Sequence, residues 1–128
     1  EIVPVEGTAM DFRTPKAIGR DADNDEPSVK PFGGYDSNFV ISGHPVATTV
    51  GDQTGITMVT DTDQPGVQLY TANALTDRKG KGGKEYSSRS AFCLETQHYP
   101  DSIHQPQWPS CILRKDEAFH SFTSYTFS

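Results

Sequence analysis

The chain has 128 residues, the length of one domain, of which 34% are hydrophobic and 11 are glycines. Even with glycine counted, this apolar share lies below the roughly 45–50% of soluble domains, so we expect a thin core. Eleven basic and 17 acidic residues give a formal charge of −6, which argues against nucleic acid as a partner. No apolar run approaches the ~18 residues that span a bilayer, which argues against a membrane partner.

The N-terminal sequence Glu1-Ile-Val-Pro-Val-Glu begins without Met and in strand-like sequence. Such a start is typical of a processed product, a cut chain or one part of a larger protein. No signal-peptide pattern opens the chain, but the removal of an export signal would leave a start of this kind. Both a cytoplasmic and an exported location therefore stay open.

The first third of the chain alternates extended segments with turns. Residues 2–5 are extended but contain a proline, which suits a strand edge, and residues 10–13 continue the extended pattern. Residues 21–27 hold four acids among small polar residues without periodicity, so we predict a mobile loop. The glycine-rich residues 31–38 form a turn that leads into the apolar run 39–41.

The middle of the chain predicts three strands with clear boundaries. Residues 47–50 and 56–60 form an antiparallel pair across a Gly/Asp turn. Residues 67–71 alternate in polarity, which places Val67 and Gln68 on opposite faces of a strand. Further strands are predicted in residues 111–113 and 118–127. The chain thus has about seven or eight short strands between Gly/Pro turns and no sustained helical periodicity, which predicts an all-β, antiparallel β-sandwich.

Two other sequence features have ordinary structural explanations. The basic cluster in residues 78–84 is rich in glycine and lacks aromatic residues, so we interpret it as a solvated loop and not as a nucleic-acid footprint. Cys93 and Cys111 lie in apolar strand-like runs, where we expect reduced thiols that act as small buried hydrophobes.

Residues 90–101 place a carboxylate in the middle of a predicted strand, at Glu95. In an extended chain Phe92 and Leu94 share one face, whereas Cys93 and Glu95 share the other. A charged side chain in such a position either faces solvent or has a chemical task. From the residues alone, both explanations stay open.

Four stretches carry motifs in a fixed order along the chain. They are Gly7-Thr-Ala-Met-Asp-Phe-Arg with Ile18-Gly19, Gly34-Tyr-Asp-Ser-Asn-Phe-Val, Thr60-Asp-Thr-Asp-Gln-Pro-Gly-Val-Gln-Leu-Tyr-Thr, and Phe92-Cys-Leu-Glu-Thr-Gln with Pro100-Asp101. Together they resemble the aldose 1-epimerase, or galactose mutarotase, family over essentially the whole chain. The resemblance implies that residues 1–128 are the C-terminal part of a galactose mutarotase-like supersandwich, whose N-terminal half is absent from this chain.

The resemblance also implies roles for three residues in the interconversion of the α and β anomers of a free hexose such as galactose or glucose. Glu95 would be the general base, and partial desolvation on a strand face would raise its proton affinity toward the working range. Asp36 and Gln68 would bind sugar hydroxyls. From the residues alone, Asp36 suits a turn position and Gln68 a solvent-facing one. The family often has His where Ser37 stands, so no sugar contact is implied there.

The general acid of the family has no counterpart in the chain. In the family it is a histidine from an Asn-His-Ser/Thr-Tyr-Phe-type stretch in the N-terminal half, and this stretch does not occur here. The four histidines of the chain, His44, His98, His104 and His120, lie outside any such motif. We therefore expect the chain alone to be inactive. Its partners would be the monosaccharide substrate and the N-terminal half, on the same polypeptide or in a second chain.

The sequence offers no motif for a metal or a cofactor. A Gly-x-Ser-x-Gly elbow, zinc-ligand spacing, a P-loop and a dinucleotide fingerprint are all missing. Asp61 and Asp63 stand two residues apart, as in calcium loops, but the further ligands of an EF-hand are missing, so we predict turn acids.

Other functions stay open beside the mutarotase hypothesis. The main alternative is a non-catalytic carbohydrate-binding supersandwich module of a larger glycan-processing protein. A phosphorylated hexose as substrate is a further option, and it would require a basic pocket outside this chain. A glycosidase pair of Glu95 and Asp36 would require a defined distance between the two carboxylates.

Overall fold

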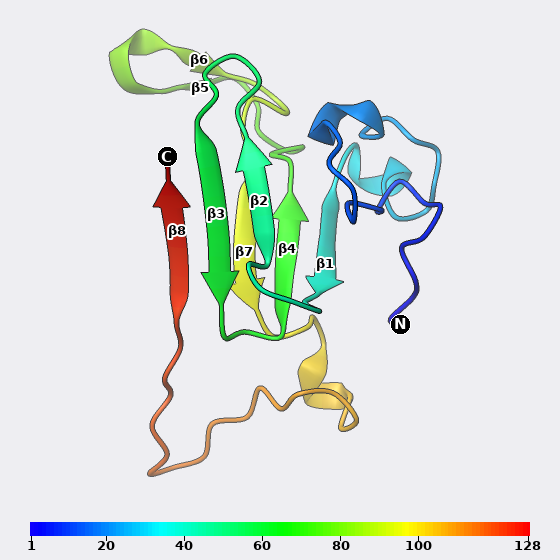
Figure 1. The fold of residues 1–128 in the computed structure, drawn as a ribbon, viewed down its shortest axis with the longest axis vertical. Coiled ribbons are helices and arrows are strands. Elements are labelled where there is room, and N and C mark those ends of the chain that lie inside the picture. Colours follow the sequence, from blue (N-terminus) through cyan, green and yellow to red (C-terminus); the bar gives the residue numbers. More distant parts are fainter. The chain divides into compact units, whose positions relative to one another are not determined.

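A computed structural model describes residues 1–128 as eight β-strands and four short 3-10 helices, without an α-helix (Figure 1). The strands are β1 (Asp36–Val40), β2 (Ala47–Val50), β3 (Thr57–Thr62), β4 (Gly66–Tyr70), β5 (Arg78–Lys79), β6 (Glu85–Tyr86), β7 (Cys93–Gln97) and β8 (Thr123–Phe127). The 3-10 helices are η1 (Ile18–Arg20), η2 (Lys30–Phe32), η3 (Lys81–Gly83) and η4 (Ser102–His104). None of the helices has the length and hydropathy of a membrane span.

The strands form three sheets, with the orders β1-β4-β7, β2-β3-β8 and β5-β6. The pairs β2 with β3, β3 with β8 and β5 with β6 are all antiparallel. The prediction of an all-β, antiparallel protein is therefore confirmed. The predicted pairing of residues 47–50 with residues 56–60 is also confirmed, because Ala47 lies opposite Thr60 and Val50 opposite Thr57.

Three predicted strands are wrong. Residues 2–5, 10–13 and 111–113 form no strand, and the last strand begins at Thr123 and not at residue 118. An extended sequence becomes a strand only where a neighbour offers backbone partners. Near residue 10 the backbone bonds a side chain and not a neighbouring strand. Both carboxylate oxygens of Glu26 accept the Ala9 N–H, at 3.0 and 3.1 Å.

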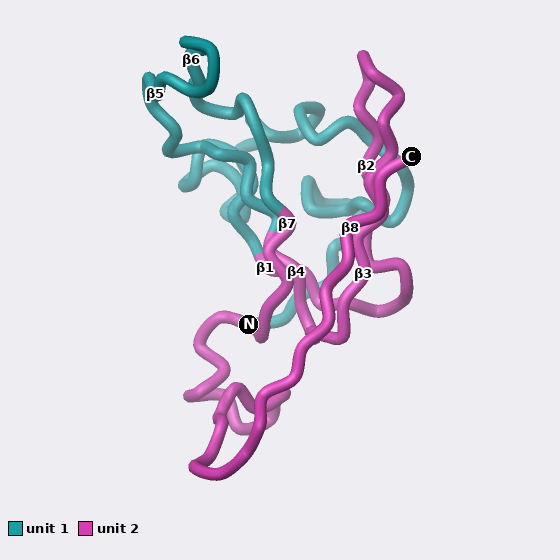
Figure 2. The backbone as a smooth tube through the Cα atoms, turned by 90° about the vertical axis from the view of Figure 1, so that its left-hand side faces the viewer, with its two compact units in different colours: residues 1–37, 69–93 teal, residues 38–68, 94–128 magenta.

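The chain forms two compact units, shown in different colours in Figure 2. Unit 1 comprises residues 1–37 and 69–93, and unit 2 comprises residues 38–68 and 94–128. The boundaries between them fall within β1, β4 and β7.

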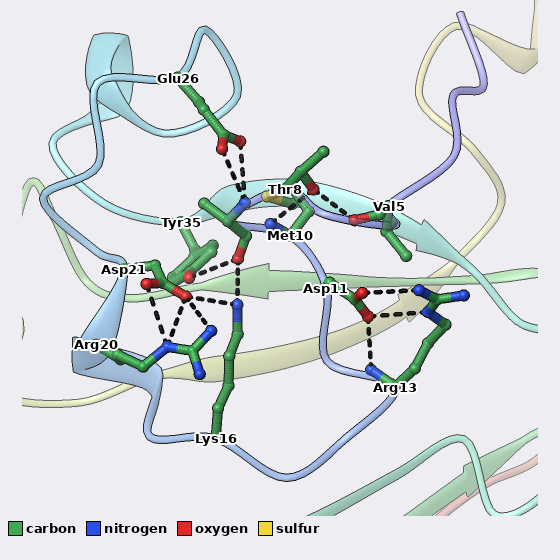
Figure 3. A network of polar contacts seen from close by, with 11 residues as sticks. Val5, Thr8, Met10, Asp11, Arg13, Lys16, Arg20, Asp21, Glu26 and Tyr35 are labelled. Atoms are coloured by element: carbon green, nitrogen blue, oxygen red, sulfur yellow. Dashed lines mark hydrogen bonds and ion pairs between the residues drawn. The ribbon is translucent and has the colours of Figure 1, made fainter.

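Unit 1 is built around a buried ammonium group (Figure 3). The Lys16 side chain is 2% exposed, and its Nζ donates to the Ala9 carbonyl at 2.5 Å and to Asp21 Oδ2 at 2.8 Å. The same Nζ lies 4.3 Å from the centroid of the Phe12 ring, which adds a cation–π contact. A buried charge is stable only with partners of this kind, so these contacts fix the course of the chain between Ala9 and Asp21.

Tyr35 joins this network to the rest of unit 1. The residue is fully buried, and its hydroxyl donates to the Ala9 carbonyl at 2.9 Å (Figure 3). Its backbone N–H donates to Thr71 Oγ1 at 3.0 Å, and its carbonyl accepts the Thr71 N–H at 3.1 Å. Tyr35 also packs edge-to-face on Phe12, with ring centroids 5.3 Å apart.

The acidic loop of residues 21–27, predicted to be mobile, is a series of bonded turns. Arg89 holds it by donating to the Ala22 carbonyl at 3.3 Å and pairing with Asp23 at 2.7 Å, while it also donates to the Gly33 carbonyl at 2.6 and 2.9 Å. Asp21 pairs with Arg20 and Lys16, whose hydrogen bonds lower its pKa to about 2. The partners Lys16, Arg20 and Arg89 lie outside residues 21–27, so the composition of the loop does not predict them.

The basic residues 78–84 lie in an exposed hairpin. Arg78 lies opposite Tyr86 and Lys79 opposite Glu85 in the two-stranded sheet β5-β6, and the residues between Lys81 and Lys84 are all exposed. The prediction of a solvated segment is confirmed, and the structure adds that its ends pair as strands.

Unit 2 contains the sheet β2-β3-β8, whose inner face is rich in hydroxyl groups. Thr60 and Thr62 of β3 are buried. Thr62 Oγ1 donates to the Phe122 carbonyl at 2.7 Å and lies 2.9 Å from Thr123 Oγ1. Thr123 Oγ1 in turn lies 2.7 Å from Thr96 Oγ1 of β7. A chain of three threonine hydroxyls thus connects β3, β8 and β7.

The acids at the end of β3 bond within the chain. Asp61 Oδ1 contacts His44 Nδ1 at 2.5 Å, and this hydrogen bond lowers the pKa of Asp61. Asp63 Oδ1 accepts the Phe122 N–H at 3.0 Å and the amide of Gln64 at 3.2 Å. The prediction of a turn acid holds for Asp63, which follows the end of β3, but is wrong for Asp61, which lies within β3 opposite Ser124.

The two cysteines are free thiols, as predicted, but both are exposed. The prediction of buried thiols is wrong because Cys111 lies outside any strand, in a run of exposed residues, and Cys93 lies on the solvent-facing side of β7.

We expect Lys16→Met to destabilise the protein, because it keeps the aliphatic chain but removes the donor to the Ala9 carbonyl. The free energy of unfolding, measured by urea denaturation, should fall by about 1.5–3 kcal/mol, the range for a hydrogen bond to a charged group. Lys30→Met is the matched control, since Lys30 pairs with Asp25 at the surface and its loss should leave stability essentially unchanged. Equal effects of the two substitutions would contradict this account of unit 1.

We also expect a stability change at high pH that depends on Tyr35. Burial raises the pKa of Tyr35 to about 12, whereas a tyrosine in an unfolded chain ionises near pH 10. The unfolded chain therefore loses this proton first, so the contribution of Tyr35 to stability is complete below about pH 10 and is lost as the pH rises toward 12. A phenolate absorbance titration should show one of the five tyrosines ionising late, and Tyr35→Phe should remove that late step.

Candidate functional site

The three predicted site residues come from the three strands of the sheet β1-β4-β7. Asp36 is the first residue of β1, Gln68 the middle residue of β4 and Glu95 the middle residue of β7. Asp36 belongs to unit 1, and Gln68 and Glu95 belong to unit 2.

Gln68 is positioned by the predicted alternation of β4, which is confirmed. Val67 and Leu69 are buried, whereas Gln68 is half-buried on the opposite side of the strand. The strand begins at Gly66, where a Cβ atom would lie 2.5 Å from Asn38 Oδ1 and 3.0 Å from the Tyr99 ring. Only glycine leaves room for Asn38 and Tyr99 at this point, so Gly66 helps to fix the course of β4.

Glu95 projects from the exposed side of β7. Leu94 and Thr96 are half-buried, while Cys93 and Glu95 are exposed. Because Thr96 Oγ1 contacts Thr123 of β8, the Thr96 side of the strand faces the sheet β2-β3-β8. Glu95 therefore lies on the side turned away from it. Gln68 and Glu95 thus stand on neighbouring strands, each on the less buried side.

The predicted partial desolvation of Glu95 is not found, because the side chain is exposed. The reason is the same alternation: the buried side of β7 is occupied by Leu94 and Thr96, and Cys93 on the Glu95 side is exposed too. Within this chain, the carboxylate is accessible to a ligand from solvent but is not shielded by a pocket wall.

Asp36 is held in place by the backbone on its N-terminal side. Gly33 and Gly34 have φ angles of 65° and 147°, as predicted for a turn that requires glycine. A Cβ atom on Gly34 would lie 2.3 Å from Asn73 Oδ1 and 2.7 Å from Thr71 Oγ1. Asn73 Nδ2 also donates to the Tyr35 carbonyl at 2.9 Å. Asp36 therefore follows a fixed turn and a buried tyrosine, and it is itself half-buried.

The Ser37 hydroxyl donates to the Ser28 carbonyl at 3.4 Å. It is therefore turned toward the backbone of unit 1, in agreement with the absence of an implied sugar contact at this position.

Two of the four histidines form pairs with carboxylates. His44 Nδ1 lies 2.5 Å from Asp61 Oδ1, and His104 Nδ1 contacts Asp101. The hydrogen bond with His104 lowers the pKa of Asp101. His98 follows the end of β7 and is half-buried, whereas His120 is exposed.

The structure adds one hollow that the sequence did not predict, an open cavity of about 240 Å³ in unit 1. Its lining residues are Ile18, Gly19, Ala22, Thr71, Arg89, Ser90, Ala91 and Phe92. The one charged group among them, the Arg89 guanidinium, already bonds Gly33, Ala22 and Asp23. The hollow is therefore mainly apolar, and no sequence motif marks it.

Known proteins are similar to this chain in sequence, and one solved structure is similar to it in fold. Galactose mutarotase from Homo sapiens is 38% identical over 133 residues, which cover 100% of this chain and 37% of the relative. Aldose 1-epimerase from Escherichia coli (strain K12) is 34% identical over 132 residues, which cover 96% of this chain and 37% of the relative. The chain therefore spans a little over a third of the length of these relatives, and the match lies in their C-terminal half.

The fold and the family model agree with these relatives. The crystal structure of a GalM/aldose epimerase homologue from C. elegans superposes with a TM-score of 0.77 at 28% identity, over 97% of this chain and 38% of that one. The expected mutarotase-type β-sandwich is thereby confirmed. A family model described as "Aldose 1-epimerase" matches residues 1–126. The chain therefore belongs to the aldose 1-epimerase family.

Proposed function

We propose that the protein is an aldose 1-epimerase, or mutarotase, which interconverts the α and β anomers of a free hexose such as galactose or glucose. Membership of the family over residues 1–126 carries this proposal. It is supported by the position of Glu95 and Gln68 on the less buried sides of two neighbouring strands. In this proposal the chain supplies the base and the sugar-binding residues.

The reaction requires one base and one acid that exchange their roles. The base takes the proton of the C1 hydroxyl while the acid protonates the ring oxygen, and the bond between C1 and the ring oxygen breaks to give the open aldehyde. After rotation about the C1–C2 bond, the ring oxygen attacks the other face of the aldehyde. The two protons then return, so no net oxidation or hydrolysis occurs.

Glu95 is the base in this proposal. It is a carboxylate on a regular strand, so its direction is fixed by the backbone and by the Thr96 contact on the other side of β7. Its exposure leaves space for a sugar hydroxyl. The shielding that a base needs would come from the bound sugar and from the part of the protein that carries the acid.

Asp36 and Gln68 bind the sugar in this proposal. A carboxylate accepts hydrogen bonds from two neighbouring hydroxyls, and a carboxamide both donates and accepts. Both side chains stand on strand positions with defined backbone neighbours, Gly34 with Tyr35 for Asp36 and Val67 with Leu69 for Gln68. Rigid placement of this kind favours the binding of one orientation of the sugar.

The acid would come from the N-terminal half of a mutarotase-type protein, in the same polypeptide or in a second chain. The share of the relatives that this chain leaves unmatched is large enough to contain it, since the chain covers 37% of them. None of the four histidines of the chain lies in the family's acid motif. We therefore expect the chain alone to be inactive.

This division of roles predicts activity only in a reconstituted mixture. The partner in the test is the segment of human galactose mutarotase that precedes its match to this chain, here called the N-terminal probe. Polarimetry of freshly dissolved α-D-galactose or α-D-glucose should show faster mutarotation with both polypeptides than with either alone. Sugar binding without any acceleration would favour the carbohydrate-binding module instead.

Glu95→Gln should lower kcat of the reconstituted protein by about 10²–10⁴-fold, the usual contribution of a positioned general base. The carboxamide keeps the size of the side chain but cannot take the proton. Glu85→Gln is the matched control, because Glu85 is an exposed glutamate in the hairpin β5-β6, and it should leave the rate unchanged. A Glu95→Gln protein with full activity would rule out the assigned base.

Gln68→Ala should weaken sugar binding by up to about tenfold, and Asp36→Asn by about 10- to 100-fold, because hydrogen bonds to a charged group are stronger. The effect should appear mainly in KM or in the dissociation constant of the sugar. Gln53→Ala and Asp52→Asn in the exposed turn after β2 are the matched controls. A loss of kcat without a change in sugar affinity would contradict the binding role.

A further inference from the structure

The last strand of the chain carries two aromatic side chains on the inner face of a sheet, yet both are exposed. Tyr125 lies opposite Thr60 and Phe127 opposite Met58, so all four side chains point to the same face. Thr60 on this face is fully buried, whereas Tyr125 is 44% and Phe127 64% exposed. Inner faces of β-sandwiches are normally covered along their length. The inner face of β8 is therefore incompletely covered.

The contacts of β8 show which part of its inner face is covered by other residues. Thr123 touches the hydroxyls of Thr62 and Thr96, and the Tyr125 hydroxyl donates to the Leu94 carbonyl at 2.9 Å. Burial then decreases along the strand, from the half-buried Thr123 to the mostly exposed Phe127. The uncovered part of the inner face is thus the C-terminal half of β8.

The backbone of β8 is also open along one edge. The order β2-β3-β8 makes β8 an edge strand (Figure 1). Ser128 and Thr57 exchange both of their backbone hydrogen bonds, at 2.8 and 3.0 Å. Because such pairs alternate along an antiparallel ladder, the backbone groups of Ser124 and Thr126 also face β3. Those of Tyr125 and Phe127 point to the open edge.

The sequence of β8 has none of the features that protect an edge strand from pairing. Thr-Ser-Tyr-Thr-Phe contains no charged residue, no proline and no bulge, and its Thr, Tyr and Phe residues favour strands. The segment before it adds further exposed apolar side chains, among them Phe119 and Phe122. An uncharged edge beside an uncovered apolar face is the arrangement that binds an added β-strand.

We propose that the outer edge of β8 docks a β-strand from the N-terminal part of a mutarotase-type protein, whose apolar side chains cover Tyr125 and Phe127. The occupant is inferred from the family, since the relatives are nearly three times as long as their match to this chain. The inference rests on the proposed function for the identity of the partner, and it adds the surface that the partner occupies. Strand pairing would supply the affinity, and the aromatic pair would fix the register.

The first test is hydrogen exchange of the full 128-residue chain with and without the N-terminal probe. The amides of Tyr125 and Phe127 should exchange at least tenfold more slowly in the mixture, whereas those of Ser124 and Thr126, already bonded to β3, should change little. A mixture in which Tyr125 and Phe127 keep their exchange rates would overturn the proposal. So would slow exchange of these two amides in the chain alone that depends on chain concentration, because a second copy would then occupy the edge.

The second test is a pair of substitutions with matched exposure. Phe127→Asp should weaken binding of the N-terminal probe by about 10- to 30-fold in titration calorimetry, the effect of losing a central apolar contact. Val50→Asp is the control, because Val50 is 63% exposed but lies on β2, at the opposite edge and on the opposite face of the same sheet. Equal losses for the two variants would overturn the assignment to β8.

The docking surface and the catalytic role fail in different ways. Glu95→Gln should keep the protection of Tyr125 and Phe127 while activity is lost. Activity of the mixture without protection of β8 would reject the docking surface and leave the proposed function intact. Protection of β8 in a mixture that never accelerates mutarotation would reject the proposed function and leave the docking surface intact.

Discussion

The hydrogen bond between the hydroxyls of Thr96 and Thr123 determines which side of β7 faces the sheet β2-β3-β8. Since side chains alternate along a strand, this single contact also determines the direction of Glu95. A shift of β7 by one residue would turn Glu95 inward and expose Thr96. The extension of the contact to Thr62 on β3 makes such a shift costly, because it would leave buried hydroxyls without partners.

The thin apolar content of the chain is balanced by polar contacts in its interior. Unit 1 has few large buried hydrophobic residues, and its centre is the ammonium of Lys16 with the phenol of Tyr35, both bonded to the Ala9 carbonyl. Unit 2 uses threonine hydroxyls in the same way. Buried polar groups that are satisfied by specific partners define one arrangement of the chain more strictly than apolar contacts alone.

The sequence predicted those parts of the fold that depend on local patterns. The pair β2-β3 follows from two β-rich runs around a turn, and β4 follows from the alternation around Gln68. Residues 2–5 were misassigned because strand formation also requires a neighbour, which the sequence does not identify. The contacts of Lys16 with Ala9 and Asp21 follow no periodic spacing, so no sequence pattern predicts them.

For the candidate site, the motifs predicted the family and the strand positions of Gln68 and Glu95, which the structure and the relatives bear out. The burial of Glu95 was predicted wrongly, because burial depends on what lies over a strand face and not on the strand's own sequence. The roles of Asp36, Gln68 and Glu95 stay predictions that come from the family resemblance.

The hairpin β5-β6 has a practical consequence for work on this protein. Its two strands pair only with each other, and the loop between them is exposed and rich in glycine. An exposed loop with few tertiary contacts tolerates the insertion of residues. A fluorescent reporter or an affinity tag inserted between Gly82 and Gly83 would therefore leave both termini unmodified and the hydrogen-bonded interior of unit 1 undisturbed.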